Sequence, residues 1–272
     1  MPNYIVTNYH LFPFHRPVFD MFAFEENLAR CAHAMSLQEL GVMCMGFFKT
    51  QTPIRNPELL LQLYQRLIKE LDTVEDITLC AILKLLRYSS KLSQVEPMKQ
   101  LLDALCPQIQ RISLMSCLHV ALLGSDIQCC HDEIVELILQ RFSLNLDSTR
   151  LKDLERICFV IGVFNYKSAS GIEVELSRRI LEMLPERLNE ILKHPRCFSN
   201  CLHFLTLNDH YHEEMLSSVL EPRFFKHAYG KNHLLGRELF HLDSFVKINL
   251  AHSYKGPQLS DKQRRTMGKV MT

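Results

Sequence analysis

Hydrophobic residues recur three or four positions apart over most of this chain, which is the spacing of one face of an α-helix. The clearest run follows Asn56 and Pro57 and continues through Tyr64 to Leu71. Asn56 is typical of a helix N-cap, and proline suits the first helical position because its missing amide hydrogen would be unpaired there anyway. The pattern therefore predicts an amphipathic helix that begins at residue 57.

The same spacing predicts further helices separated by short breaks. Ser36 and Glu39 form a capping box, in which each side chain pairs with a free backbone amide of the other residue. Another start is predicted at 73–76, and Pro97 precedes a helix that ends before Pro107. Later helices are predicted at about 110–123, 132–142, 150–164, 173–192 and 198–207. Only the apolar cluster at 245–250 is also compatible with a short strand.

Pairs of apolar residues end the first helix of each predicted helical pair at nearly constant intervals of 38, 37, 41 and 41 residues. These pairs are Phe47-Phe48, Leu85-Leu86, Leu122-Leu123, Val163-Phe164 and Phe204-Leu205. A helix pair leaves an apolar face that only a neighbouring pair can cover, so regular repetition predicts stacking. The predicted fold is all-α, an α-solenoid-like array of helical hairpins with a repeat of about 38 residues. The alternative is a non-repetitive helical domain with accidental spacing.

Three segments are predicted along the chain. Residues 1–35 contain Pro2, Pro13 and Pro17 among many aromatic residues, which predicts an irregular lead-in packed on the first helices. Residues 36–215 form the helical-repeat array, and residues 216–272 form a separate C-terminal segment. The first thirty residues resemble neither a secretory signal nor a transit peptide, so we expect either a removed leader or a fragment of a longer protein.

Composition excludes several classes of function. There are 31 Lys and Arg residues against 30 Asp and Glu, so any attraction to RNA must come from a local patch. Most of the ten cysteines lie in apolar helical runs, which favours free thiols and a reducing compartment. The best apolar stretch, 114–124, is far shorter than the roughly 20 residues that a membrane-spanning helix needs, so no membrane insertion is expected.

Four segments carry a resemblance to a known family, and together they cover most of the chain. They are Ser36-Leu-Gln-Glu-Leu-Gly-Val through Gly46-Phe-Phe-Lys-Thr50, Arg150-Leu-Lys-Asp-Leu-Glu-Arg-Ile157, the stretch from Leu239 to Leu250, and Tyr254-Lys-Gly-Pro-Gln-Leu259. These segments resemble the FAST kinase domain-containing family of mitochondrial RNA-binding proteins. The resemblance implies an octotricopeptide-like array and a mitochondrial matrix location. The family's nuclease-like C-terminal RAP domain has no match here, so no catalytic role is expected from it.

Motifs for enzymatic chemistry are missing. A protein kinase needs a Gly-rich phosphate loop, a strand lysine, a His-Arg-Asp loop and an Asp-Phe-Gly, and this sequence has none of them. It also lacks the Gly-x-Ser-x-Gly turn that is typical of a nucleophilic serine. We therefore expect no enzyme and no cofactor.

Two clusters of cysteine and histidine could suggest a metal ion, but neither has the Cys-x-x-Cys spacing of a zinc site. They are Cys129-Cys130-His131 and Cys197 with Cys201 and His203. A third polar cluster, from His210 to Glu214, is more typical of a solvated turn between helices. No metal site is expected.

RNA binding needs cations that neutralise phosphates and side chains that stack on or hydrogen-bond unpaired bases. Candidates follow the aligned apolar pairs, where each hairpin turns. The predicted RNA-binding residues at these turns are Lys49, Arg87, Tyr88, Asn165, Tyr166 and Lys167. Lys152 and Arg156 are also predicted to bind RNA, as an extension of the patch, and Arg178 and Arg179 would extend it further. The alternative interpretation is that these are solvated charges, which the helix dipole favours at helix C-termini.

The function hypothesis, drawn mainly from the resemblance, is a scaffold that holds single-stranded mitochondrial RNA along the repeat surface and supports transcript processing or stability. Other RNA-processing proteins are possible partners. The alternative is a helical protein–protein adaptor without nucleic-acid contact, which the formal charge of +1 favours.

Overall fold

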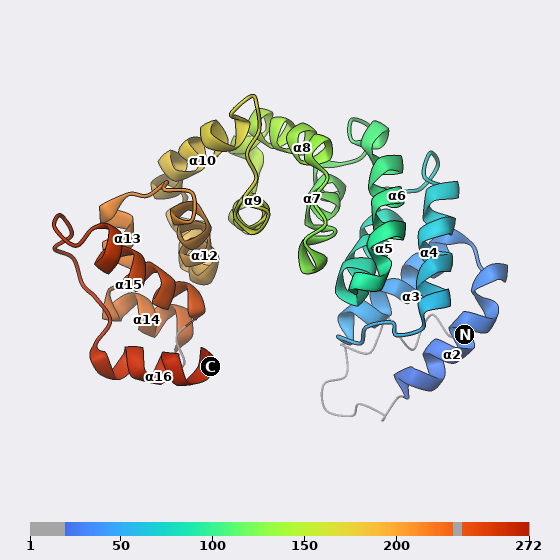
Figure 1. Ribbon diagram of the computed structural model, residues 1–272, viewed down its shortest axis with the longest axis horizontal. Helices are drawn as coiled ribbons and strands as arrows, with labels where there is room; N and C mark the ends of the chain where they lie inside the picture. The colour runs from blue at the N-terminus through green and yellow to red at the C-terminus, as the bar shows by residue number, and fades with distance from the viewer. Residues whose placement is uncertain (1–19, 231–235, 272) are drawn as a thin grey trace. The chain divides into compact units, whose positions relative to one another are not determined.

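The computed structural model describes residues 20–230 and 236–271, and the described residues contain helices and turns but no strand (Figure 1). Within them, no helix combines the length and the apolar character that crossing a membrane requires. Contacts divide the chain into two compact units, residues 1–138 and 139–272, and each is described by itself.

The first unit contains α2 (Met21–Cys31), α3 (Leu37–Lys49), α4 (Pro57–Lys69), α5 (Asp76–Ser89), α6 (Val95–Leu105) and α7 (Leu114–Leu122). Helix α8 (Asp132–Leu144) includes the division between the units. The second unit contains α9 (Leu151–Val163), α10 (Ile172–Met183), α11 (Leu188–Lys193), α12 (Pro195–Thr206), α13 (Glu213–Val219), α14 (Pro222–Tyr229), α15 (Arg237–Asn249) and α16 (Asp261–Met271). Short 3₁₀ turns lie at Ala32–Ala34, Leu92–Gln94, Cys106–Gln108, Ser125–Ile127, Leu146–Ser148 and Leu184–Arg187.

Each unit contains a row of helices that pack side by side although they are not consecutive in the chain. In the first unit α3 packs on α5 and α5 packs on α7, while α4 packs on α6 in a second row. In the second unit α9 packs on α12 and α12 packs on α15. We call α3, α5, α7, α9, α12 and α15 the first-layer helices, and the helices between them the second-layer helices. This alternation confirms the predicted all-α array of helical hairpins.

Hydrogen bonds between neighbouring hairpins join residues about one repeat apart. In the first unit the Ser113 backbone N–H donates to Asp76 Oδ1 over 3.0 Å, across a separation of 37 residues. In the second unit Arg187 donates to the Thr149 carbonyl oxygen over 2.5 Å, across 38 residues. These bonds show that the period read from the sequence is the step from one hairpin to the next.

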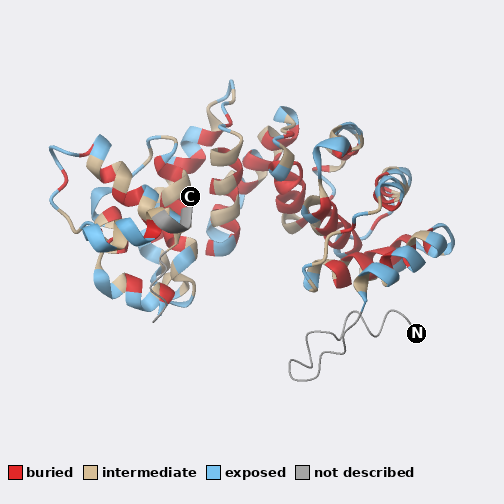
Figure 2. Cartoon of the chain, turned by 60° about the horizontal axis from the view of Figure 1, so that its bottom comes forward, coloured by how far each residue is buried: buried red, intermediate tan, exposed pale blue. Residues whose placement is uncertain are grey.

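The core lies where the apolar faces of packed helices meet, and Figure 2 shows buried stretches along many of the helices. Phe47 and Leu59 are fully buried, and the Tyr64 hydroxyl, 3.8 Å from Met98 Sδ, joins α4 to α6. Burying one Leu, Ile or Phe side chain contributes roughly 1.5–3 kcal/mol. Most of the stability therefore comes from faces that only a neighbouring hairpin covers.

The predicted helix starts agree closely with the structure. The Ser36 and Glu39 side chains both complete the capping box at α3, and the Asn56 side chain accepts hydrogen bonds from two amides at the start of α4. The start predicted at 73–76 corresponds to α5, whose N-cap Glu75 makes no side-chain capping bond.

Other predictions were wrong. The irregular lead-in is helical at 21–34, where Asp20 caps α2, and residues 1–19 lie outside the described residues. Residues 245–249, for which the sequence also allows a strand, belong to helix α15. The single helix predicted at 173–192 is interrupted by a 3₁₀ turn that contains Pro185, because proline lacks the amide hydrogen needed inside a helix.

Gly41 sets the closest approach of α3 to α5. A Cβ at this position would lie 3.0 Å from Thr78 Cγ2 and 3.3 Å from the Thr78 Cα, so a side chain would push the two helices apart. At Gly268, by contrast, an added Cβ would meet no described atom within 4 Å apart from its chain neighbours and the backbone of its own helix.

We expect Gly41→Val to lower the free energy of unfolding by roughly 1–3 kcal/mol, because it overpacks a buried helix contact. Gly268→Val is the matched control and should change stability by less than about 1 kcal/mol. Urea denaturation followed by circular dichroism measures both. Equal effects of the two substitutions would contradict the close packing at Gly41.

Candidate nucleic-acid interface

The hairpin end in the first unit is built by a Schellman motif, a left-handed turn that ends α3. The Thr52 amide donates to the Phe47 oxygen over 3.0 Å and the Gln51 amide donates to the Phe48 oxygen over 3.1 Å. Gln51 has a φ of 56°, a conformation that costs energy in any residue with a Cβ. The predicted contact Lys49 is the last residue of α3 and its side chain is exposed.

Tyr88 of α5 lies against this hairpin end. Its hydroxyl donates to the Gln51 carbonyl oxygen over 2.8 Å, and its ring meets Phe48 edge-on with centroids 6.2 Å apart. The side chain nevertheless remains 42% exposed, and Arg87 beside it is half-buried. Two successive hairpins of the first unit therefore place an exposed ring and polar side chains next to each other, as the repeat predicts.

The second unit repeats the motif at the end of α9. Asn165 has a φ of 46°, and the Tyr166 amide donates to the Ile161 oxygen over 3.0 Å. Lys167 follows and donates to Asn208 Oδ1 over 2.9 Å, which joins the ends of α9 and α12. Asn165 and Lys167 are exposed.

Tyr166 corrects the sequence prediction because it is only 5% exposed. A buried ring cannot stack on a base, so Tyr166 is a packing residue. The residues with a left-handed backbone also correct the alignment of the apolar pairs between repeats. Gln51, Asn165 and Asp209 are equivalent, which aligns Phe47 with Ile161 rather than with Val163.

Lys152 and Arg156 lie in the first half of α9, away from its hairpin end. Eleven residues separate Lys152 from Val163, which is about 16 Å along a helix. Asp153 is buried and pairs with Arg150 at 2.7 Å and with Arg156 at 3.3 Å, whereas Lys152 is exposed. Lys152 and Arg156 therefore lie apart from the side chains at the hairpin end and do not extend that surface.

The two arginines considered as extensions of the patch are held by other groups on α10. Arg178 pairs with Glu175 at 2.8 Å and with Glu182 at 2.5 Å. Arg179 donates to the Ser143 carbonyl oxygen over 3.0 Å. Both guanidinium groups are therefore engaged by partners on second-layer helices.

A cluster of rings that the sequence prediction missed joins α9, α12 and α15. We call Phe159, His203, Phe204 and His241 the ring cluster. The Phe159 and Phe204 centroids are 5.3 Å apart, and His203 lies 4.9 Å from Phe204 and 4.8 Å from His241. None of the four rings is buried, and His241 is exposed. The sequence did hold a signal, because Lys152, Arg156 and Phe159 share one helix face.

His203 is the most perturbed group of the ring cluster. Partial burial of the ring and the neighbouring His241 together lower the pKa of its imidazole to about 4, so the ring is neutral at physiological pH. Its Nδ1 is buried and has no hydrogen-bond partner among the described residues. The ring is therefore held by packing and not by a hydrogen bond.

The cysteines and histidines that resembled metal ligands have other surroundings. His131 Nδ1 accepts a hydrogen bond from the Ile134 amide, and its Nε2 lies 3.1 Å from Asp103 Oδ1. Burial, with a hydrogen bond to Glu155, raises the pKa of the Cys197 thiol to about 12. Burial also raises the pKa of the Cys201 thiol. Within residues 20–230 and 236–271, no three His, Cys, Asp or Glu side chains gather in a way that could hold a metal ion.

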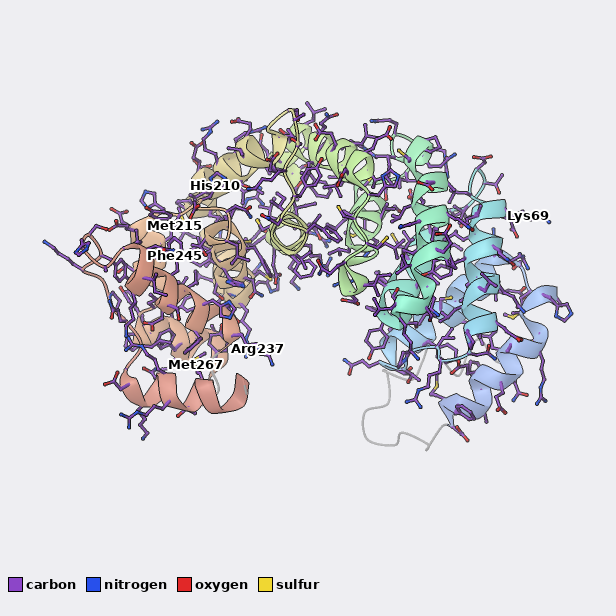
Figure 3. All side chains as sticks on the ribbon, in the orientation of Figure 1. Lys69, His210, Met215, Arg237, Phe245 and Met267 are labelled. Atoms are coloured by element: carbon purple, nitrogen blue, oxygen red, sulfur yellow. The ribbon has the colours of Figure 1, made fainter. Side chains whose placement is uncertain are left out.

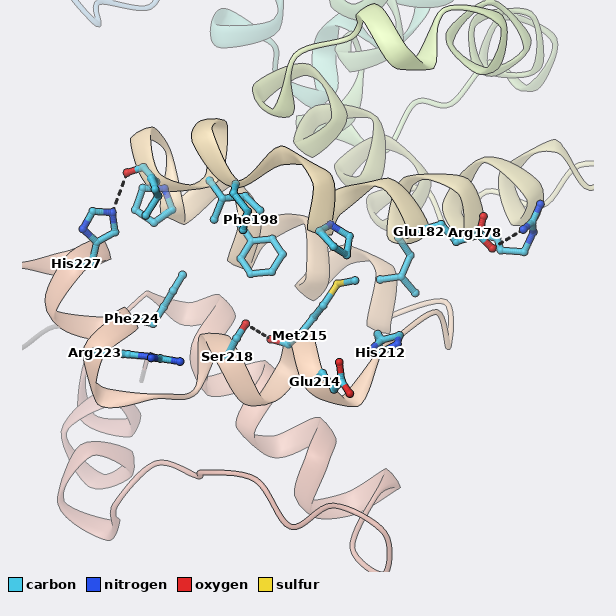
Figure 4. Close-up of a pocket in the computed structure, with 16 residues that line it drawn as sticks. Arg178, Glu182, Phe198, His212, Glu214, Met215, Ser218, Arg223, Phe224 and His227 are labelled. Atoms are coloured by element: carbon cyan, nitrogen blue, oxygen red, sulfur yellow. Dashed lines mark hydrogen bonds and ion pairs between the residues drawn. The ribbon is translucent and has the colours of Figure 1, made fainter.

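An apolar groove of about 1080 Å³ lies between the second-layer helices α10–α11 and α13–α14 (Figure 4). Phe198 and Phe224 meet edge-on with centroids 6.4 Å apart, and Met215 also lines the groove. Leu188 and Leu192 contribute exposed methyl groups, at 64% and 61% exposure. This groove is the feature that a protein-binding adaptor would use.

Comparison with known proteins supports the family resemblance. FAST kinase domain-containing protein 5, mitochondrial, of Mus musculus is 23% identical over 87% of this chain, that of Macaca fascicularis is 23% identical over 83%, and that of Homo sapiens is 22% identical over 83%. This chain is related to the FAST kinase domain-containing proteins. It spans 29–30% of the length of these relatives. No family model matches the chain.

Two of the segments that carry the resemblance build structure rather than chemistry. Asp243 is 1% exposed, accepts the Leu259 amide over 2.8 Å and pairs with Arg264 at 2.7 Å. Tyr254 donates to the Pro257 oxygen over 3.0 Å, and a Cβ at Gly256 would lie 2.5 Å from the Tyr254 hydroxyl. These contacts fasten α16 and the segment before it onto α15.

We expect Asp243→Asn to lower the free energy of unfolding by roughly 3 kcal/mol, because it leaves Arg264 without its buried partner. The matched control is Asp261→Asn, which removes the other carboxylate of the same arginine, 3.3 Å away and 85% exposed. The control should cost less than about 1 kcal/mol. Chemical denaturation of both variants measures the difference, and equal losses would contradict a structural role specific to Asp243.

Stability should fall as pH decreases from about 6.5 toward about 4. The unfolded His203 takes up a proton in this range, whereas the folded protein resists that proton because the pKa is lowered to about 4. We expect His203→Phe to flatten the fall of melting temperature between pH 6.5 and pH 5. His33→Phe, at an exposed position, is the control and should leave the pH profile unchanged. An unaltered profile in the His203 variant would be the contrary result.

Proposed function

We propose that this protein is a mitochondrial RNA-binding scaffold, which holds single-stranded transcripts along its first-layer helices and supports their processing or stability. In this proposal the chain binds and presents RNA and breaks no bond itself. The relationship to proteins named as mitochondrial supports the location. The function in RNA metabolism is what the family resemblance implies.

One structural observation carries the proposal furthest. Residues at the ends of successive first-layer helices contact each other across one repeat, at Tyr88 with Gln51 in the first unit and at Lys167 with Asn208 in the second. A linear ligand with a regular backbone matches a surface on which equivalent side chains recur. Lys49, Arg87 and Lys167 would contact phosphates, and the exposed Tyr88 would stack on a base.

The adaptor alternative is favoured by a different feature, the apolar groove that contains Phe198, Phe224 and Met215. Apart from Pro195 and Phe198 at the start of α12, its helical lining lies on and next to second-layer helices, whereas the candidate RNA contacts lie elsewhere on first-layer helices or directly after them. Substitutions can therefore separate the two functions.

We expect replacement of Lys49, Arg87 and Lys167 together by Glu to lower the affinity for single-stranded RNA by about 100-fold or more, because three phosphate contacts become repulsive. The log-log dependence of affinity on salt should become shallower by about 2, because each phosphate contact with a single strand contributes roughly 0.7 to the slope. Filter binding or fluorescence polarisation with a short unstructured RNA measures both quantities, and circular dichroism checks that the helices remain.

The control replaces Lys69, Lys99 and Lys193 by Glu, which makes nearly the same charge change at exposed positions of the second-layer helices α4, α6 and α11. The control should bind RNA within about threefold of the unaltered protein. Equal loss in both triple variants would mean that only total charge matters, and binding by neither the variants nor the unaltered protein would reject the proposed function.

A further inference from the structure

The exposed side of the first-layer helices in the second unit carries cations at one end and rings at the other. On α9, Lys152, Arg156 and Phe159 follow each other at spacings of four and three residues, which places them on one face. On α15, Arg237 and His241 are four residues apart, and Figure 3 labels Arg237 at the start of that helix. Between them, α12 contributes His203 and Phe204.

The rings of this face are placed where core packing does not require them. Phe159 and Phe204 are half-buried, while the core of the same helices is made by fully buried residues such as Leu154 and Leu202. Gly162 lets Phe204 lie close to α9, because an added Cβ would be 3.3 Å from Phe204 Cδ1. Aromatic rings left partly exposed beside cations are typical of surfaces that bind single-stranded nucleic acid.

Polar contacts hold the helices that carry these rings. Asn200 of α12 donates to Glu155 Oε1 of α9 over 2.6 Å. This bond joins the two helices about one helical turn before Phe159 and Phe204. On the other side, the Ser199 hydroxyl lies 3.5 Å from Glu238 Oε1 of α15. The ring cluster is therefore a preformed surface whose members come from three successive hairpins.

We propose that the ring cluster of Phe159, His203, Phe204 and His241 is a stacking platform for unpaired nucleobases, with Lys152, Arg156 and Arg237 placed for the adjoining phosphates. This inference rests on the proposed RNA-binding function and adds a base-contacting site that is separate from the hairpin ends. The neutral His203 ring, packed between Phe204 and His241, adds no charge that a stacked base would have to desolvate. Stacking a base on a ring raises affinity by about 5- to 150-fold per base.

The test compares a short unstructured RNA with an abasic ribose-phosphate oligomer of the same length and charge, using the full chain. The unaltered protein should bind the RNA at least about tenfold more tightly than the abasic oligomer. Phe204→Leu and His241→Ala should each lose about fivefold or more of RNA affinity, leave abasic binding unchanged and keep the same salt dependence. His241 is exposed, so its variant reports on binding even if Phe204→Leu is destabilised.

The matched control is Phe224→Leu, which removes a half-buried ring of the apolar groove in the same unit. It should bind RNA as the unaltered protein does. Equal affinity of the unaltered protein for RNA and abasic oligomer would overturn the platform while leaving the phosphate-based function standing. No binding to either ligand would reject the proposed function itself. Equal loss in Phe224→Leu and Phe204→Leu would also overturn the platform.

Discussion

Within each unit, the packing of a first-layer helix on the first-layer helix one repeat later is the constraint on which the rest of the structure depends. It buries the faces that a lone hairpin would leave in water, and it determines which side chains become neighbours. The contacts of Thr78 with Gly41 and of Ser113 with Asp76 both lie between one hairpin and the next. The hairpin ends and the ring cluster, which both join successive first-layer helices, are consequences of it.

Sequence reasoning could predict the elements because helix starts and apolar spacing are local. Ser36 and Asn56 act as caps through neighbours within three residues, so no knowledge of the fold was needed. The interval between apolar pairs was likewise a property of the chain alone. The register of the repeat could not be read in the same way, because it depends on which residue adopts the left-handed backbone. That residue is Asn165, so the aligned apolar pair near it was placed two residues too late.

The candidate site was harder to predict because exposure is a tertiary property. Tyr88 and Tyr166 occupy similar places in the pattern, yet one ring is 42% exposed and the other 5%. Phe159 and His241 are 82 residues apart in sequence and are linked through His203 and Phe204 of α12, so the one local signal, the face of α9 that holds Phe159, could not reveal the cluster. Two of the segments that carried the family resemblance, those that contain Asp243 and Tyr254, proved to build the scaffold instead.

Left-handed turns end three first-layer helices, and they allow the side chains at the hairpin ends to vary. Glycine adopts this backbone most easily, but the chain places Gln51, Asn165 and Asp209 there, at a cost of about 1 kcal/mol each. Each turn therefore keeps a polar side chain at an equivalent position, anchored by the same backbone bonds. Because those bonds do not involve the side chain, its chemistry can change between hairpins, or between related proteins, without rebuilding the array.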